Sequence, residues 1–462
     1  MGSTASAHIT KLMPKDCSSA NEDRCYICID LKSFYASVEA VDRGLDPMTV
    51  NLAVADPDRG QTTICLAITP AMKQLGIRNR CRVYEIPDNV QYVKAKPRMR
   101  HYMEVSAHIY GIYLRYVCKE DIHVYSIDEC FIDITSYLGL YHQTAIEFSN
   151  MLRQAVFDDT GICATVGIGT NLFLAKVALD ITAKHTKEHI GYVDQKTFVA
   201  KVGKHRPITD IWNVGPGIAE RLSHYGVFDL CGVAAMDEDV LYREFGSNAR
   251  YLIDHAHGIE PCTIAQIQAY KPKAQSLCSG QILPSDYTYD EALVVLKEMA
   301  DALILDLVDR HAVAGSVSIS IGYARQPGAD SAGYNGSGAS AYQGEHGTRP
   351  RTHRGNVTRK LPERTHSRSR LLPAFETLFA QTASHDRPIR RLSIGFGSIL
   401  PEEFAEDNLF TDVQAENDEQ HLQQAILAVR GKFGKNALLH GRSLTEKATA
   451  RERNCQIGGH RA

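Results

Sequence analysis

Three carboxylates lie where apolar segments end, a position that suggests metal chemistry. Asp30 comes at the end of the apolar run CYICIDL, and Asp128 and Glu129 fall in SIDE, a tight connection between two short predicted strands. A charge among apolar neighbours needs a compensating partner, because an unpaired buried charge costs much free energy. A divalent cation is one such partner, since magnesium binds carboxylate oxygens together with substrate phosphates. Spacing alone leaves a second explanation open, in which these are solvated acids in ordinary turns.

Two glycine-containing segments could approach phosphates. Gly167–Thr170, with the letters GIGT, departs from the dinucleotide pattern GxGxxG because Leu172 stands where the third glycine belongs. We interpret it as a turn that lets the chain pass close to the strands carrying the acids. The second segment, Val214–Gly217, precedes a predicted helix. There the backbone N–H groups of Gly215 and Gly217 could hold a phosphate group, although an ordinary helix–helix turn has similar letters.

The elements that must position these residues alternate between strands and helices over the first part of the chain. Residues 207–261 are helical in pattern, and a second α+β region follows from about residue 275 to 400. We predict strands at Tyr26–Leu31, Leu52–Ala55, Thr63–Ile68, His123–Tyr125, Cys130–Ile134, Cys163–Ile168, Gly315–Tyr323 and Ile389–Ile399, and helices at Phe34–Val41, Met99–Tyr116, Ala145–Phe157, Leu172–Ala183 and Tyr289–Arg310. This pattern indicates an α+β protein of several domains.

The composition is that of an ordinary globular protein. The chain has 462 residues, of which 44% are hydrophobic and 23% charged, a length that corresponds to about two to four domains. No apolar run reaches the roughly 18–20 residues of a membrane span, and residues 1–23 have the polar character of a flexible leader, so we expect a cytoplasmic protein without membrane contact. Of the 12 cysteines, only Cys25 and Cys28 are paired in sequence; they point to opposite faces of a strand and favour buried thiols over a zinc site.

Charge is unevenly distributed in the second half of the chain. Residues 349–370 contain eight Lys or Arg and one acid, Glu363, whereas residues 401–420 contain eight acids and no Lys or Arg. This favours a polyanion-binding domain followed by an interaction tail, although a solvated face beside a linker would have the same composition. Residues 326–347, rich in Gly, Ser and Ala, are typical of a flexible insertion.

Four motifs occur in order and give the chain a family resemblance. They are DLKSFYASVE, YSIDECFIDI, GIGTNLFLAK and DIWNVGPGIAERL. Together they resemble the Y-family translesion DNA polymerases, and the likeness is to the bacterial UmuC-like branch, which is related to DinB (DNA polymerase IV). It extends from about Cys25 to Ile399, most of the chain.

The resemblance implies an α+β multidomain fold shaped as a right-hand polymerase. Its parts would be a ferredoxin-like palm, small fingers, a helical thumb with a helix-hairpin-helix, and an α+β little finger. On the sequence, these correspond to a leader at 1–23, a palm at 24–205 with fingers inserted at about 46–98, a thumb at 206–272, a little finger at 273–400 interrupted by the 326–347 insertion, and a C-terminal tail at 401–462.

The resemblance also implies the reaction and its cofactor. A primer 3′-hydroxyl would attack the α-phosphate of a dNTP on primer-template DNA and release pyrophosphate, in low-fidelity translesion synthesis during DNA repair and the SOS response. Asp30 and Asp128 would bridge two Mg²⁺ ions, the carbonyl oxygen of Leu31 would add a ligand, and Glu129 would complete the site. We expect a monomer. Two alternatives are a non-catalytic adaptor of the same fold that binds clamp and DNA, and a palm-type nucleotidyl cyclase.

Further site residues follow from the same likeness. Tyr35 corresponds to the steric gate against ribonucleotides, with Phe34 beside it at the nucleotide, and Lys73 and Lys176 correspond to triphosphate contacts. Pro70 stands where the family has a phosphate-contacting tyrosine, which is a departure. Two further pairs follow the basic and the acidic segments: Arg359 and Lys360 as DNA contacts, and Leu409 and Phe410 as a sliding-clamp motif in which Glu406 replaces the usual glutamine.

Overall fold

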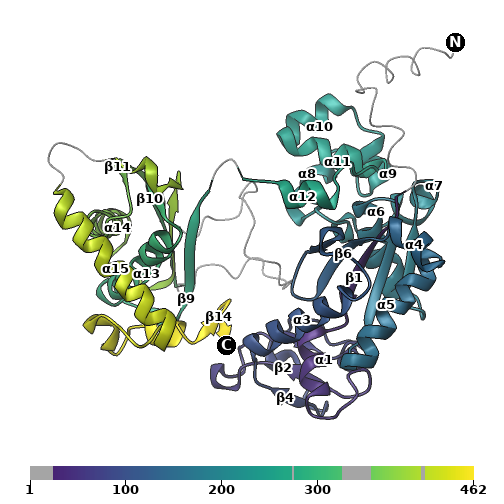
Figure 1. Cartoon of the computed structure of the whole chain (residues 1–462), viewed down its shortest axis with the longest axis horizontal. Coiled ribbons are helices and arrows are strands. Elements are labelled where there is room, and N and C mark those ends of the chain that lie inside the picture. The colour runs from purple at the N-terminus through teal and green to yellow at the C-terminus, as the bar shows by residue number, and fades with distance from the viewer. Residues whose placement is uncertain (1–23, 273–274, 325–354, 407–411) are drawn as a thin grey trace. The chain divides into compact units, whose positions relative to one another are not determined.

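The computed structural model describes residues 24–272, 275–324, 355–406 and 412–462. These residues fall into two compact units, one ending at Tyr270 and the other beginning at Lys271 (Figure 1). Both units combine sheets and helices, so the predicted α+β multidomain class is confirmed. The predicted leader, the 326–347 insertion and the clamp motif at Leu409 and Phe410 lie outside the described residues.

The palm is built on a five-stranded sheet with the order β5-β6-β1-β7-β8. Its strands are β1 (Tyr26–Leu31), β5 (Ile122–Val124), β6 (Glu129–Asp133), β7 (Ala164–Gly169) and β8 (Ile190–Val193). All neighbours pair antiparallel except β7 and β8. The central strand β1 is apolar and buried along nearly its whole length, as is typical of a strand with both faces covered. The sheet is therefore mostly antiparallel, in agreement with the ferredoxin-like palm that the family resemblance implies.

Helices pack on this sheet and carry several of the candidate residues. They are α1 (Phe34–Val41), α3 (Met99–Tyr113), α4 (Thr135–Tyr141), α5 (Ala145–Thr160), α6 (Leu172–Val177) and α7 (Gln195–Phe198). A π-helical turn, Ala178–Thr182, continues α6. The helix α5 begins at a capping box formed by Thr144 and Glu147, which satisfies two otherwise unpaired backbone N–H groups.

Interpreting Gly167–Thr170 as a turn was wrong for its glycines, because Gly167 and Gly169 lie inside strand β7. The helix α6 crosses their face of the strand so closely that side chains do not fit. A Cβ atom on Gly167 would lie 2.2 Å from the carbonyl oxygen of Ala175, and one on Gly169 would lie 2.2 Å from the nitrogen of Ala175. Both glycines allow helix and strand backbones to touch.

The fingers form a small unit around a three-stranded sheet with the order β3-β2-β4. The strands are β2 (Leu52–Val54), β3 (Ala67–Ile68) and β4 (Val93–Ala95), and the helix is α2 (Pro70–Gln74). The strand predicted at Thr63–Ile68 is thus shortened to its last two residues. Pro70 occupies the first turn of α2, where its missing N–H group costs nothing.

The thumb is helical and is joined to the palm by side-chain hydrogen bonds. Its helices are α8 (Pro216–Ser223), α9 (Leu230–Ala234), α10 (Glu238–Phe245), α11 (Ala249–Ala256) and α12 (Ile264–Ala269). The indole of Trp212 donates to the hydroxyl of Tyr125 at 3.0 Å. The side chain of Gln268 on α12 donates to the carbonyl oxygen of Ile122 at 3.1 Å, which covers the edge strand of the palm sheet.

The second unit is a four-stranded antiparallel sheet with helices on one face. The order is β11-β10-β12-β9, with β13 (Leu400–Pro401) paired to β10. The elements are β9 (Leu277–Tyr287), β10 (Ala312–Tyr323), β11 (Gly355–Thr365), β12 (Ile389–Gly397), α13 (Tyr289–Asp309) and α14 (Arg368–Thr382). Val317, Ile319 and Ile321 of β10 face the helices. The alternate residues, Ser316, Ser318 and Ser320, therefore form the open face with their neighbours on β12.

The segment after residue 412 is folded onto this unit. It contains α15 (Val413–Phe433), α16 (Ala450–Arg453), β14 (Gln456–Ile457) and β15 (His460–Arg461). Buried acids of α13 hold it: Glu298 accepts from the backbone nitrogens of Thr449 and Ala450 at 2.9 Å and 3.0 Å, and Asp301 pairs with Arg442.

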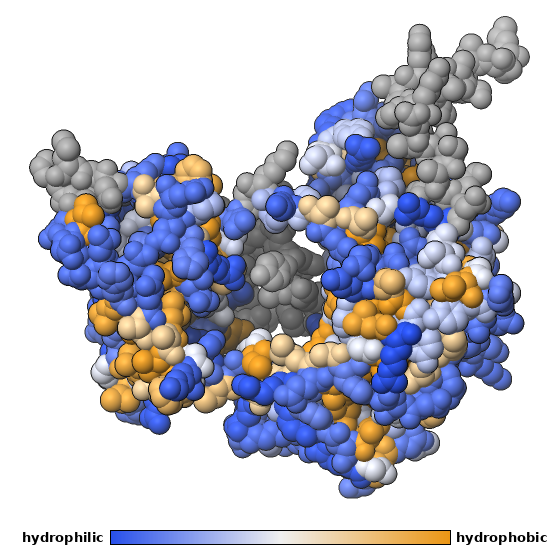
Figure 2. Space-filling model, in the orientation of Figure 1, coloured by the Kyte–Doolittle hydropathy of each residue, from blue (hydrophilic) through white to orange (hydrophobic). Residues whose placement is uncertain are grey.

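The molecular surface is largely hydrophilic in the view of Figure 2, with apolar side chains over the lower part of the C-terminal segment. Leu422, Phe433 and Leu444 are among its exposed apolar residues. In the part of the chain that the structure describes, no helix is long and apolar enough to cross a membrane.

Candidate active site

The three acids meet at one end of the central palm strands. The antiparallel register of β1 and β6 puts Asp30 directly opposite Glu129. The backbone nitrogen of Leu31 donates to the carbonyl oxygen of Asp128 at 2.9 Å, which closes the end of this strand pair. A single strand pairing thus brings acids of the first and the second sequence motif side by side.

Each acid has a protein partner in the structure. An Asp30 carboxylate oxygen lies 3.1 Å from Nζ of Lys184, and a Glu129 oxygen lies 2.7 Å from Nζ of Lys176. Asp128 accepts from the hydroxyl of Ser126 at 2.7 Å. Burial raises the pKa of Asp30, Lys184 opposes that effect, and the charges of Asp128 and Glu129 add to it. The site therefore concentrates negative charge that only nearby cations offset.

Asp180 connects the two lysines. It lies in the π-helical turn, 3.1 Å from Nζ of Lys176 and 2.8 Å from Nζ of Lys184. The side chain of Lys176 is 9% exposed, whereas that of Lys184 is 40% exposed. Burial by itself lowers the pKa of Lys176, but Cys28, Asp180 and Glu129 outweigh it and the pKa is raised. Lys176 is therefore an internal counter-ion.

Lys184 was not singled out from the sequence, although it is the accessible cation beside Asp30. The signal was available in the spacing, since Lys176, Asp180 and Lys184 recur every four residues and so share one face of a helix. A π-turn at this position is also typical of functional sites. Burial lowers the pKa of Lys184, and the neighbouring Asp30 and Asp180 carboxylates reverse that effect.

The donor set fits a hard divalent cation by its chemistry. Asp30, Asp128 and Glu129 offer carboxylate oxygens, and the carbonyl oxygen of Leu31 lies between them in the chain. Among the described residues, no three His, Cys, Asp or Glu side chains converge as a ready metal cage. Two of the three acids are instead paired with lysines, so an ammonium group now supplies the compensating charge.

The ring of Tyr35 is held by stacking on a residue of helix α3. The ring lies 4.7 Å from that of Tyr102 on α3, at an angle of 28°. The hydroxyl of Tyr102 donates to the fully buried Glu39 at 2.8 Å, and Arg98 donates to the same carboxylate at 2.8 Å. Burial and the charge of Asp128 raise the pKa of Tyr35, which reflects its place beside the acids. Phe34 is 2% exposed and packs in the core.

Lys73 projects from the exposed side of α2 in the fingers. Burial lowers its pKa, and the charges of Asp30 and Asp128 oppose that effect. The charges of Lys73 and of these two carboxylates therefore interact. Pro70, three residues earlier, begins the same helix.

The residues predicted to contact DNA differ in how accessible they are on the surface. Gly215 and Gly217 flank the start of α8, and both have open space where a side chain would be. On the second unit, Lys360 pairs across from Ser316 and shares the open face of the sheet. Arg359 pairs across from the buried Val317 and donates to Gln381 of α14 at 2.5 Å, so it lies on the helix side.

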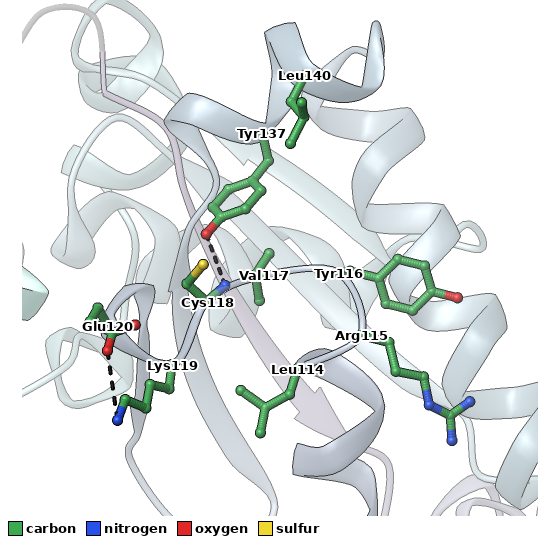
Figure 3. Close-up of a pocket in the computed structure, with 9 residues that line it drawn as sticks. All are labelled: Leu114, Arg115, Tyr116, Val117, Cys118, Lys119, Glu120, Tyr137 and Leu140. Atoms are coloured by element: carbon green, nitrogen blue, oxygen red, sulfur yellow. Dashed lines mark hydrogen bonds and ion pairs between the residues drawn. The ribbon is translucent and has the colours of Figure 1, made fainter.

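A shallow cavity of about 480 Å³ lies elsewhere on the palm (Figure 3). It is formed by the end of α3, the loop that follows it and α4. Figure 3 shows the hydrogen bond that the backbone nitrogen of Cys118 donates to the hydroxyl oxygen of Tyr137. None of the candidate catalytic or binding residues is among those that line it, which are Leu114, Arg115, Tyr116, Val117, Cys118, Lys119, Glu120, Tyr137 and Leu140.

Comparisons with known proteins identify the family of the chain. Residues 29–180 match the impB/mucB/samB family, and residues 274–409 match the C-terminal domain of the same family. The chain belongs to this family, the Y-family DNA polymerases. The acids, Tyr35, Lys73 and Lys176 lie within the first match, Lys184 lies just beyond its end, and Lys360 lies within the second.

Individual relatives extend over nearly the whole chain. The putative UV-damage repair protein UvrX of Bacillus subtilis is 29% identical over 94% of this chain and 97% of its own length. DNA polymerase IV 2 of the same organism is 28% identical over 95% of this chain and 99% of its own length. Among solved structures, a Y-family DNA polymerase chimera, Dbh-Dpo4(243-245)-Dbh, matches with a TM-score of 0.60 at 17% identity and covers 82% of this chain and 99% of that one. The enzyme class is that of a DNA-directed DNA polymerase of DNA repair.

Proposed function

We propose that the protein carries out low-fidelity, template-directed DNA synthesis past damaged bases by a two-metal nucleotidyl transfer. The observation that supports this most directly is the meeting of Asp30, Asp128 and Glu129 at the paired ends of β1 and β6. The family as a whole implies dependence on a divalent metal. Two Mg²⁺ ions, the dNTP substrates and the roles of single residues are part of the proposal.

In this proposal the acids and the lysines exchange partners when substrates arrive. Asp30, Asp128, Glu129 and the carbonyl oxygen of Leu31 would hold the magnesium ions. When bound, such ions polarise phosphate oxygens and ease loss of the proton from the primer 3′-hydroxyl. Lys184, released from Asp30, would then pair with the triphosphate, and Lys73 would approach it from the fingers as a point charge.

Sugar choice is assigned to Tyr35. Its stack on Tyr102, and the anchoring of Tyr102 by the buried Glu39, hold the ring rigidly, and the charge of Asp128 acts on its hydroxyl group. A rigid ring in this position would collide with a ribonucleotide 2′-hydroxyl and leave a deoxynucleotide unaffected. Phe34 would support Tyr35 from the core rather than contact the nucleotide.

DNA binding is assigned to elements that offer unhindered backbone and positive charge. The start of α8, with Gly215 and Gly217, would hold the duplex phosphates from the thumb. The open sheet face with Lys360 would add sequence-independent, salt-dependent contacts. Leu409 and Phe410 would bind a sliding clamp, which raises the local concentration of enzyme at the primer end.

The competing hypothesis is an adaptor that binds DNA and clamp without catalysis. All three acids are present in this chain, with Asp30 and Glu129 paired with lysines and Asp128 accepting from Ser126, an arrangement that an adaptor has no need to keep. Primer extension distinguishes the two. Purified protein with magnesium, dNTPs and a primer-template carrying an abasic site should extend the primer, and an adaptor would not.

The site is tested by Asp128→Ala, with the exposed Asp158→Ala as a matched control on α5. We expect Asp128→Ala to abolish extension and to bind primer-template as the wild type does, since the proposed DNA contacts lie on other elements. Asp158→Ala should extend normally. Extension at the wild-type rate by Asp128→Ala would overturn the assignment of the active site.

A further inference from the structure

Three basic side chains from separate elements gather beside the carboxylates. Nζ of Lys32, in the turn between β1 and α1, lies 3.0 Å from Nδ1 and 2.8 Å from Nε2 of His189. His189 precedes β8 in a left-handed conformation with a φ of 56°. The neighbouring Glu188 accepts from Arg153 of α5 through its carbonyl oxygen at 2.7 Å. Lys32, Arg153 and His189 are called the basic cluster below.

The contacts of the basic cluster are to neutral groups. Besides Glu188, Arg153 donates to the side-chain oxygen of Asn150 at 3.2 Å, and its Nε atom is buried without a hydrogen-bond partner in the described residues. Burial, together with the charges of Lys32 and Arg153, lowers the pKa of His189. The His189 ring is therefore neutral near pH 7 and accepts from Lys32. Two positive charges remain in the cluster, on Lys32 and Arg153.

The acid nearest in sequence does not neutralise them. Asp30 precedes Lys32 by two residues, but its carboxylate already pairs with Lys184 at 3.1 Å. Among the described residues no carboxylate forms an ion pair with Lys32 or Arg153, and burial and mutual repulsion both oppose such a pair of cations. Such an arrangement is stabilised when an anion binds.

The adjoining helix start has an unused donor. Ser33 has a left-handed conformation with a φ of 47° at the N-cap of α1, and its side chain does not cap the helix. Its hydroxyl oxygen is buried and has no hydrogen-bond partner among the residues that the structure describes. The first turn of α1 also carries the partial positive charge of a helix N-terminus. Lys32, Ser33 and the first turn of α1 therefore follow one another in the chain directly after Asp30 and Leu31.

We propose that Lys32 and Arg153, with Ser33 as a donor and His189 as a positioning residue, form an anion subsite for the terminal phosphate of the incoming triphosphate. The inference rests on the proposed function and adds a second group of cations to Lys184 and Lys73. When the bond between the α-phosphorus and its bridging oxygen breaks, pyrophosphate leaves with the electron pair. The subsite then stabilises that developing charge and holds the product.

The test compares Lys32→Met with Lys119→Met, a control whose side chain is 75% exposed elsewhere on the palm. Methionine keeps the length of lysine and removes its charge. We expect the KM for the dNTP in single-nucleotide incorporation and the inhibition constant of pyrophosphate each to rise about tenfold, the effect of losing one charged hydrogen bond. In Lys32→Arg, the KM for the dNTP and the inhibition constant of pyrophosphate should both stay close to the wild-type values. His189→Ala should raise these two constants less than Lys32→Met does. The affinity for primer-template should not change.

A second readout does not depend on turnover. Calorimetric titration of the wild type with magnesium pyrophosphate should show binding that Lys32→Met weakens, with an unchanged circular dichroism spectrum. An unchanged KM and unchanged pyrophosphate inhibition in Lys32→Met would overturn the subsite and leave the proposed polymerase function intact. Loss of secondary structure and DNA affinity in Lys32→Met would show a structural role and also overturn it. Failure of the wild type to extend a primer would instead count against the proposed function.

Discussion

Replacing Lys176 by methionine would test whether one buried ammonium group holds the acids of the active site together. Its Nζ atom lies 2.7 Å from Glu129 and 3.1 Å from Asp180. Methionine has a similar length and shape, so packing on α6 is largely kept while the charge is lost. The variant leaves Glu129, with a side chain 11% exposed, without its cation.

The magnitude follows from the environment of the two acids. Removing one partner of a buried ion pair costs roughly 3–5 kcal/mol. The lower end applies, because Asp180 keeps Lys184 at 2.8 Å and Glu129 keeps the thiol of Cys28 at 3.0 Å. About 3 kcal/mol corresponds to a fall in Tm of roughly 6–12 °C for a unit of this size. Lys184→Met is the matched control: its side chain is 40% exposed, and an exposed pair contributes only about 0–1 kcal/mol.

The assay is thermal unfolding of wild type, Lys176→Met and Lys184→Met with and without magnesium. A cation bound by the folded state restores the missing charge, and ligand at about 100 times its Kd contributes about 2.7 kcal/mol. Magnesium should therefore recover most of the Tm that Lys176→Met loses. A Tm within about 2 °C of the wild type without magnesium would refute the role of Lys176 as a structural counter-ion. Equal losses in both lysine variants would refute the argument from burial.

Three further outcomes are expected. Tyr35→Ala should relax discrimination against ribonucleotides in single-nucleotide incorporation, and an unchanged dNTP-to-rNTP ratio would place the gate elsewhere. Asp30→Asn should abolish extension and raise Tm near pH 7. The pKa of the Asp30 carboxyl is raised on folding, so this group stabilises the fold below its unfolded pKa of about 4 and loses that contribution as pH rises through the folded pKa. If the Tm difference between Asp30→Asn and the wild type did not grow from pH 4 to 7, this reasoning would be contradicted. The double variant Leu409→Ala, Phe410→Ala should weaken binding to the cognate clamp in a titration, and equal affinity would remove that site.

Local signals in the sequence were sufficient to predict the elements that depend only on residues near one another in the chain. The strand Tyr26–Leu31 and the helix Phe34–Val41 have the predicted bounds, because an apolar run and a helical repeat determine them without distant partners. In the second unit, β9 and β11 were not predicted. Each contains a proline, Pro284 and Pro362, and neither has a regular apolar alternation, so pairing with β10 and β12 makes them strands.

The order of motifs in the sequence determined the class of enzyme and which acids to suspect, since residue types and spacing are properties of the chain itself. Only the tertiary structure decided which cations stand beside those acids. Lys184 reaches Asp30, and Lys32 meets His189, through elements that come together only when the sheet has formed. The same holds for Arg359, which the β10 register turns to the helix side. Strand register and helix crossing are long-range contacts, and a one-residue shift in register would turn every side chain to the other face.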